Sequence, residues 1–351
     1  MSRPAPIPQM PLRVVVADDS ALMRRMLSDA LEGQGCTVVG VASNGDEALG
    51  VCARLRPDVL SLDLAMPGLD GIGVLQALRD QASPIPVVVV SAFSPAHGAR
   101  AVDALAEGAV ELVAKPGPGM PIQAFVAELG EKVRAAASSR VRAHVARPHR
   151  ATPSPPPARR RAAPGGPRPV VIACSTGGPK ALADLLPMLP ARVGAGTLVV
   201  QHMPAGFTGS LAVRLDRSSR LAVSEAAHGD VLDPGRVYIA PGGRHLRLDE
   251  SGALRLTDEP EIGGLRPRAD LTIEDAAARW GARTLLVVLT GMGRDGLEGA
   301  RALHQRGGRI LVEAESTCTV YGMPRAIAEA DLADRELPLP ELAAAIVEEA
   351  G

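Results

Sequence analysis

The sequence has few cysteines, almost no net charge and no long apolar run. Its four cysteines, in 351 residues, are too scattered for a disulfide framework, and no two form the Cys-x-x-Cys pair of metal or redox sites. We therefore expect reduced thiols. A formal net charge of −1 lacks the strong positive field on which binding to nucleic acid or to an acidic membrane surface usually depends. We expect no nucleic-acid partner.

No uninterrupted apolar stretch approaches the ~18 residues of a membrane helix, and the opening MSRPAPIPQMPLR lacks the apolar core of a signal peptide. We expect a soluble cytoplasmic protein that does not insert into a membrane. The length of the chain and its 46% hydrophobic content are sufficient for two domains with separate cores.

A basic, proline-rich segment divides the chain. Residues 135–169 contain eight arginines and no acidic residue. Such a segment buries too little apolar surface to offset the entropy lost on ordering, so we expect an extended connector. The predicted domains are residues 12–134 and 169–345, joined by an Arg/Pro-rich linker at 135–168. Contact of the linker with nucleic acid is the weaker alternative to a solvated connector.

Short valine-rich runs alternate with helical patterns on both sides of this linker. The alternation predicts two α/β domains, each a mostly parallel sheet with helices on both faces. The predicted strands are at residues 13–18, 58–63, 87–92, 169–175, 196–202, 236–242, 283–291 and 308–313. Ser20 is the predicted N-cap of a helix that ends near Gly33. The apolar face predicted for this helix consists of Leu22, Met26, Leu27, Ala30 and Leu31.

Three aspartates follow predicted strands of the first domain. Asp18 and Asp19 end the first strand and Asp63 ends the second, so the three carboxylates should meet at one sheet edge. Their repulsion is tolerable only with a divalent cation or a raised pKa, and hard oxygen ligands favour Mg²⁺. Ser91, at a strand end, and Lys115, in ELVAKPG, suit two phosphoryl oxygens. Each residue alone is also a common turn residue, but the ordered set predicts a phosphate acceptor at Asp63.

Residues 12–134 resemble the receiver domain of two-component response regulators. The resemblance implies a flavodoxin-like fold and phosphorylation of Asp63 by a chemotaxis histidine kinase, with Ser91 and Lys115 sensing the phosphate. The Mg²⁺ ligands that it implies are Asp18, Asp19, Asp63 and the main-chain carbonyl of Ala65. The motifs that carry the resemblance are ADDS (17–20), LDLAMPGLDG (62–71), SA (91–92) and KPG (115–117). Because a receiver needs an output, we expect phosphorylation to control the second domain.

In the second domain, a serine, a histidine and an aspartate follow predicted strands. Ser175 lies between the run VVIAC and TGGPK, beside a helix start whose amides can stabilise an oxyanion. His202 ends the next run, and Asp295 lies on a glycine-rich loop after the strand at 283–291. Strand ends thus bring a nucleophile, a base and an orienting carboxylate to one side of the sheet. This pattern predicts an acyl-transfer site.

Other residues compete for these roles. His245 is a second candidate base, and Asp230 and Asp270 are alternative orienting carboxylates. CSTGGPK can also be interpreted as a phosphate loop, but the Gly-x-x-x-x-Gly-Lys-Ser/Thr spacing is absent. A DNA-binding output domain and a nucleotide-binding module are the competing classes of function. The α/β pattern with mixed charge disfavours the first.

Residues 169–345 resemble the catalytic domain of CheB-type chemotaxis methylesterases, and the order of receiver, linker and esterase matches that family. The resemblance implies a triad of Ser175, His202 and Asp295, with the amides near Thr176 and Met292 at the oxyanion and no cofactor for the ester chemistry. The implied substrates are glutamate γ-methyl esters on the cytoplasmic helices of chemoreceptors, which release methanol, and receptor glutamines, which are deamidated. The matching motifs are STGGP (175–179), QHMP (201–204), YIAPGGRHL (238–246), LTGMGRDG (289–296) and YGMP (321–324).

The chain departs from these families at three places. Leu112 stands where receivers usually carry a switch aromatic. Leu265 and Arg268 stand where the esterases usually have histidine and serine, and EAES (313–316) replaces the usual Gln-Asp-Glu run. We expect the ester chemistry to be kept, with altered substrate contacts and a divergent rim of the site.

Overall fold

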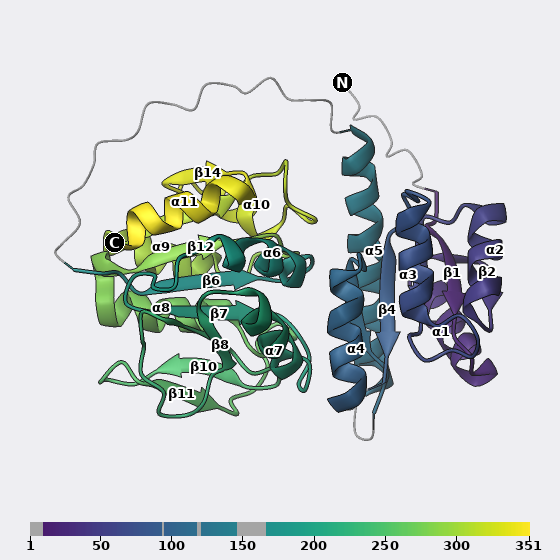
Figure 1. Ribbon diagram of the computed structural model, residues 1–351, viewed down its shortest axis with the longest axis horizontal. Coiled ribbons are helices and arrows are strands. Elements are labelled where there is room, and N and C mark those ends of the chain that lie inside the picture. The colour runs from purple at the N-terminus through teal and green to yellow at the C-terminus, as the bar shows by residue number, and fades with distance from the viewer. Residues whose placement is uncertain (1–9, 93–94, 118–120, 146–165) are drawn as a thin grey trace, which may run out of the picture. The chain divides into compact units, whose positions relative to one another are not determined.

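The structure, a computed structural model, describes residues 10–92, 95–117, 121–145 and 166–351 (Figure 1). The chain forms two compact units, each built on its own parallel sheet. The predicted two-domain α/β fold is confirmed. None of the helices in the described part of the chain combines the length and apolar character that a membrane span requires.

The first sheet has five strands. Its elements are β1 (Arg13–Ala17), α1 (Ala21–Gly33), β2 (Thr37–Ala42), α2 (Gly45–Leu55), β3 (Val59–Leu62), α3 (Gly71–Asp80), β4 (Val87–Ser91), α4 (Pro95–Ala106), β5 (Glu111–Ala114) and α5 (Ile122–Val145). The strand order is β2-β1-β3-β4-β5, with every neighbouring pair parallel, which is the flavodoxin-like order. The strand order therefore confirms the predicted flavodoxin-like receiver fold.

Helices α1 and α5 share one core with this sheet, in which Leu27 and Phe125 are fully buried. As predicted, Ser20 caps α1 by accepting a hydrogen bond from the Met23 amide, at 3.4 Å. The predicted apolar face is wrong at Leu22, which is 76% exposed, whereas Met23 packs against the core. One residue turns a helix by about 100°, so a shift of a single position moves a side chain off the buried face.

The predicted linker begins too early. Helix α5 continues to Val145, so residues 135–145 are helical rather than extended. Ala136 and Ala137 are buried in the first core, because the alanine run supplies both high helix propensity and small apolar side chains. Most of the predicted linker, residues 146–165, lies outside the described residues. At its far end Arg168 is buried.

The second sheet has seven strands. Its elements are β6 (Val170–Cys174), α6 (Gly178–Leu185), β7 (Thr197–Gln201), α7 (Thr208–Ser218), β8 (Ala222–Glu225), β9 (Arg236–Ile239), β10 (His245–Leu248), β11 (Leu254–Thr257), α8 (Ala269–Trp280), β12 (Leu285–Val288), α9 (Leu297–Gln305), β13 (Arg309–Glu313), α10 (Met323–Ala328), β14 (Arg335–Leu337) and α11 (Leu339–Ala350). The order is β14-β13-β12-β6-β7-β9-β8, all parallel, and β10 and β11 form a separate antiparallel pair. The sequence patterns did not predict that pair or the edge strands β2, β5, β8 and β14.

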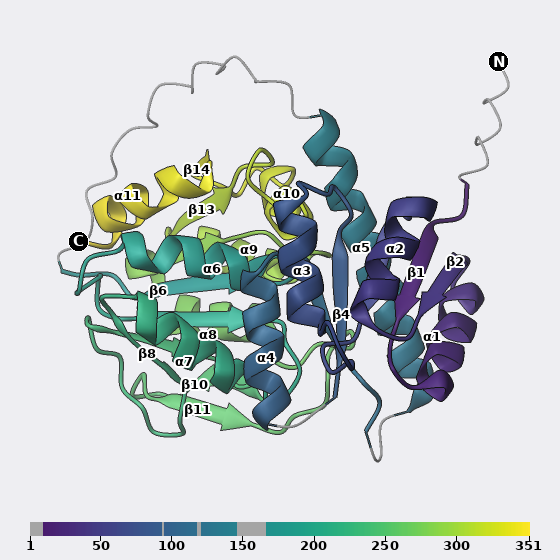
Figure 2. The same cartoon turned by 45° about the vertical axis from the view of Figure 1, so that its right-hand side comes forward.

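The strand order of the second sheet reverses at β6. From β6 the chain adds β7 on one side and, later, β12 and β13 on the other. Helices cover both faces of this sheet (Figure 2), and α8 packs on the face that carries Val171 and Ala173. In open parallel sheets, ligands bind outside the carboxyl ends of the strands at such a reversal. Ser175 directly follows β6, so it lies at this position.

Candidate functional site

The backbone around Ser175 is fixed on both sides. Its amide donates a hydrogen bond to the carbonyl of Thr290, at 3.1 Å, which joins the end of β6 to the end of β12. Its carbonyl accepts hydrogen bonds from the Gly178 amide, at 2.7 Å, and from Nε2 of Gln201, at 3.1 Å. The Ser175 backbone is therefore held just before α6 by Gln201 of β7 and by Thr290, which follows β12.

Two glycines allow this close approach. A Cβ at Gly291 would lie 3.0 Å from the Cβ of Ser175 and 2.4 Å from the Sδ of Met323. A Cβ at Gly178 would lie 2.0 Å from Oε1 of Gln201. Contacts this short are not tolerated by packed side chains, so the absence of a side chain at these positions is what lets the neighbouring strand ends meet.

His202 and Asp295 form a buried hydrogen-bonded pair. The amide of His202 donates to the carbonyl of Cys174, at 3.1 Å, which places the His202 backbone beside the end of β6. Nε2 of His202 lies 2.7 Å from Oδ2 of Asp295, and the two side chains are only 7% and 2% exposed. The structure thus brings the predicted base and the predicted orienting carboxylate together. Since Nε2 faces the carboxylate, Nδ1 remains to accept a proton.

The carboxylate of Asp295 also caps α8. Oδ2 accepts a hydrogen bond from the Ala269 amide, at 2.7 Å, and Oδ1 accepts from the amides of Asp270 and Gly296, at 3.0 and 2.9 Å. Burial acts to raise the pKa of Asp295, but the bond to His202 and the helix amides outweigh it, so its pKa is well below the usual value. Asp295 is therefore ionised beside His202.

Two polar residues that were not predicted from the sequence, Gln201 and Thr290, connect the loops of the site by hydrogen bonds. Gln201 donates through Nε2 to the carbonyls of Ser175 and His202, at 3.1 and 2.9 Å. The hydroxyl of Thr290 donates to the carbonyl of Thr176, at 2.9 Å, and both side chains are buried. Their only sequence signal is that they lie inside the motifs QHMP and LTGMGRDG.

The predicted oxyanion residues, Thr176 and Met292, lie on the loops that follow β6 and β12. Thr176 follows Ser175 directly, and Met292 follows Gly291, the residue packed against Ser175. The backbone segments of both residues therefore flank the position of the serine, as an oxyanion site requires.

The competing residues are engaged elsewhere. His245 is fully buried with Nε2 3.1 Å from the carbonyl of Pro260, and Asp230 accepts a hydrogen bond from the Ala227 amide. Asp270 accepts from the Gly299 amide, at 2.9 Å. Among the described residues, Asp295 is the carboxylate that is hydrogen-bonded to His202.

Arg268 lies behind the His202–Asp295 pair. Nη2 of Arg268 lies 2.8 Å from Oδ2 of Asp270, and its Nε lies 3.5 Å from Oδ1 of Asp295. That this departure from the family pattern alters substrate contacts stays a prediction. Leu265 lies in a tight backbone turn, where it exchanges two 3.3 Å hydrogen bonds with Ile262. The arginine thus contacts the two carboxylates at the start of α8.

Glu313 is a core residue rather than part of a divergent rim. It ends β13, is fully buried, and accepts a hydrogen bond from the Thr290 amide through Oε2, at 2.8 Å. Burial raises the pKa of its carboxyl group. The prediction of an altered rim at 313–316 is therefore wrong for its first residue, because β13 is an internal strand of the sheet.

We expect the Glu313→Gln variant to lose less folding stability than the wild type as pH rises. The carboxyl group binds its proton more tightly in the folded protein than in the unfolded one. Folding stability is therefore fully present below the unfolded pKa, near 4.5, and falls as pH rises through the raised folded value. Each unit by which the pKa is raised corresponds to about 1.4 kcal/mol. Thermal unfolding of the full chain at pH 5 and pH 8 should show a smaller decrease for Glu313→Gln than for the wild type.

The exposed Glu298→Gln is the control for this comparison, and it should behave as the wild type does. Equal pH dependence in Glu313→Gln and the wild type would show that Glu313 does not titrate in this range.

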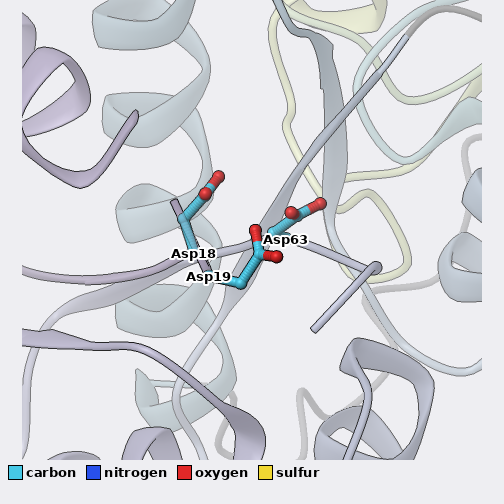
Figure 3. A group of neighbouring side chains, drawn as sticks. All are labelled: Asp18, Asp19 and Asp63. Atoms are coloured by element: carbon cyan, nitrogen blue, oxygen red, sulfur yellow. The ribbon is translucent and has the colours of Figure 1, made fainter. Parts of the chain in front are cut away.

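At the first sheet, the predicted acidic residues lie together. One oxygen atom from each of Asp18, Asp19 and Asp63 lies within 4.8 Å of the others (Figure 3). Asp18 and Asp63 are buried, whereas Asp19 is exposed. Nζ of Lys115 lies 2.7 Å from Oδ2 of both Asp18 and Asp63. The lysine therefore offsets part of the negative charge of this group.

The electrostatics of this group favour a cation. Burial raises the pKa of Asp18 despite the opposing effect of Lys115. Burial acts to lower the pKa of Lys115, but Asp18 and Asp63 outweigh it and raise its pKa, so the ammonium stays charged. Three clustered carboxylates, one of them open to solvent, fit a hard divalent cation such as Mg²⁺.

The remaining predicted residues lie at or near the same sheet edge. Ser91 ends β4 and is buried, and its hydroxyl has no hydrogen-bond partner among the described residues. The amide of Ala65 donates to Oδ1 of Asp63, at 3.3 Å, so its loop passes beside the acidic group. Leu112 is buried within β5. The structure thus places a buried hydroxyl at the end of β4 and a leucine in the strand that precedes Lys115.

Comparison with known proteins matches both halves of the chain. A family model for CheB methylesterase matches residues 170–346, and one for the response regulator receiver domain matches residues 14–126. Proteins named protein-glutamate methylesterase/protein-glutamine glutaminase are similar over nearly the full length. The one from Symbiobacterium thermophilum is 44% identical over 98% of this chain and 98% of its own, and number 5 from Myxococcus xanthus is 45% identical over 94% and 95%.

A solved structure supports the assignment of the second half. The crystal structure of the Thermotoga maritima CheB methylesterase catalytic domain is 43% identical to this chain, with a TM-score of 0.51, and the match covers 52% of this chain and 99% of that domain. The chain therefore belongs to the CheB methylesterase family, as an enzyme that also carries a response regulator receiver domain.

Proposed function

We propose that this enzyme hydrolyses γ-methyl esters of glutamate on the cytoplasmic helices of chemoreceptors, releasing methanol, and that it deamidates receptor glutamines. The names of the similar proteins support this substrate class. The observation that carries the proposal is the buried 2.7 Å hydrogen bond between His202 and Asp295. These residues follow β7 and β12, the strands on either side of β6, which Ser175 directly follows.

Ser175 acts as the nucleophile and His202 as its base. Because Asp295 accepts the proton of Nε2, Nδ1 of His202 carries the lone pair that takes the proton of the serine hydroxyl. The hydroxyl oxygen attacks the ester carbonyl, and the amides near Thr176 and Met292 stabilise the oxyanion. The imidazolium then protonates the leaving methoxide, and methanol departs.

The acyl-enzyme is hydrolysed by the reverse sequence of proton transfers. His202 takes a proton from water, the hydroxide attacks the acyl carbon, and glutamate is released as Ser175 recovers its proton. A glutamine side chain enters the same sequence with ammonia as the leaving group. The ionised Asp295 stabilises the imidazolium in every step.

Phosphorylation of the first domain regulates this activity. Asp63 accepts phosphate from a chemotaxis histidine kinase, while the hydroxyl of Ser91 and the ammonium of Lys115 each bind a phosphoryl oxygen. Asp18, Asp19, Asp63 and the carbonyl of Ala65 would hold Mg²⁺. When bound, Mg²⁺ neutralises charge on the phosphoryl oxygens.

The test is methanol release from a methylated chemoreceptor, with and without a small acyl phosphate and Mg²⁺. We expect the phosphodonor to raise the rate of the wild type about 5-fold or more, which corresponds to the lower end of typical coupling free energies. Asp63→Asn should keep the basal rate but lose the stimulation, because an amide cannot accept the phosphoryl group.

The exposed Asp46→Asn, at the start of α2, is the matched control and should be stimulated as the wild type is. If the phosphodonor stimulates Asp63→Asn, Asp63 is not the residue whose phosphorylation raises the rate. The esterase proposal is not affected by that result. Absence of methanol release from the wild type under both conditions would contradict the esterase proposal itself.

A further inference from the structure

We propose that Arg268 is a positioning residue for the ester hydrolysis: its guanidinium joins Asp295 to a second buried carboxylate, Asp270, and keeps both as negative charges, so that Asp295 remains the partner of His202. This inference rests on the proposed function. It concerns a position at which the chain departs from the usual serine of its family.

The geometry places Arg268 between the two carboxylates. Its Nη2 donates to Oδ2 of Asp270, at 2.8 Å, its Nε lies 3.5 Å from Oδ1 of Asp295, and its Nη1 donates to the carbonyl of Ile262, at 3.0 Å. The side chain of Arg268 is 22% exposed, whereas those of Asp270 and Asp295 are 5% and 2% exposed. The positive charge thus lies on the solvent side of two negative charges that have almost no contact with water.

Without a nearby positive charge, the buried carboxylates of Asp270 and Asp295 would compete for a proton. Burial raises the pKa of Asp270, and the charge of Asp295 raises it further. Asp270 is not free to move away, because its Oδ1 accepts the Gly299 amide of α9 and its own amide donates to Asp295. A guanidinium stays protonated at every pH at which proteins fold, so Arg268 is a permanent countercharge for the pair.

Other charged groups also face this pair. His202 contacts Asp295 from the end of β7. Glu274 of α8 interacts with Asp270, and burial raises its pKa, while Arg247 of β10 lies among Glu274, Asp275 and Glu259. Arg294 is adjacent to Asp295 in the sequence but is exposed. Arg268 is therefore the described cation that has contacts with both Asp270 and Asp295.

The expected consequence concerns the acid limb of the pH profile. Removing a positive charge beside Asp295 favours proton binding to the His202–Asp295 pair, and a protonated pair is inactive. Arg268→Gln should therefore shift the acid limb of kcat/KM for methanol release upward by about 0.5–1 pH unit. It should also lower kcat about 10-fold at neutral pH, with little change in KM. Arg268→Lys keeps the charge and should largely retain the wild-type profile.

A second substitution tests the mechanism through the partner. Asp270→Asn keeps the acceptor for the Gly299 amide but removes the competing charge, so it should shift the acid limb downward. Combined with Arg268→Gln, it should return the limb close to the wild-type position. A purely structural role of Arg268 would change the unfolding temperature and not produce this compensation.

Arg244→Gln is the matched control. Arg244 pairs with the exposed Asp258 through two hydrogen bonds, of 2.9 and 3.2 Å, and the profile of this variant should not shift. The inference is overturned if the wild type releases methanol and the acid limb of Arg268→Gln is not shifted. It is also overturned if Arg268→Gln raises only KM, because that result indicates a substrate contact. If Arg268→Gln does not fold, an unshifted Asp270→Asn overturns it. A wild type without methanol release contradicts the proposed function instead.

Discussion

Ser175→Ala is expected to lower methanol release from a methylated chemoreceptor by about 10³-fold or more, without changing the fold. The hydroxyl is the attacking group, so no other part of the site can replace it in the first step. All hydrogen bonds of Ser175 with described residues run through its backbone, so alanine removes none of them. The unfolding temperature and the circular dichroism spectrum should match those of the wild type.

Ser251→Ala is the control for this substitution. Ser251 lies in an exposed turn, where its hydroxyl donates to Asp249 at 2.6 Å, and its loss should leave methanol release within about 2-fold of the wild type. Activity of Ser175→Ala above a tenth of the wild-type rate would show that another group is the nucleophile.

Asp295→Asn is expected to lower kcat by about 10³- to 10⁴-fold, as in other triads in which the carboxylate becomes an amide. The neutral side chain no longer stabilises the imidazolium or holds the proton on Nε2 of His202. Both carboxylate oxygens also accept amides of α8, so an NH₂ group at either position faces another donor. We therefore expect the free energy of unfolding to fall by about 1–3 kcal/mol as well.

The two effects are separated by measuring kcat well below the unfolding temperature of the variant. Asp230→Asn is the matched control, because Asp230 accepts one amide, from Ala227, at a turn and was one of the two alternative aspartates considered from the sequence. It should keep kcat within about 2-fold of the wild type. If the Asp295→Asn enzyme is less stable but fully active, Asp295 only caps α8 and has no role in the reaction.

The linear sequence determined the inner strands of both sheets and the polar residues that follow them. Runs such as VVIAC and TLLVV are too apolar and too short for anything but buried parallel strands, and their polar successors must emerge at one sheet edge. Ser175 and His202 were predictable for this reason, as were the aspartates after β1 and β3. A continuous apolar run is a local property, so it can be interpreted without knowing the partner strands.

Contacts between segments far apart in the sequence were decided only by the tertiary structure. Asp295 accepts the amides of a helix that begins 26 residues earlier, and Glu313 is buried under Thr290, 23 residues away. The contacts of Arg268 with two carboxylates were not predictable, because spacing along the chain does not show which carboxylates α8 and the 291–296 loop bring to it. Burial and charge pairing depend on the residues that other segments bring to a packed interface. Periodicity along the chain does not show which residues those are.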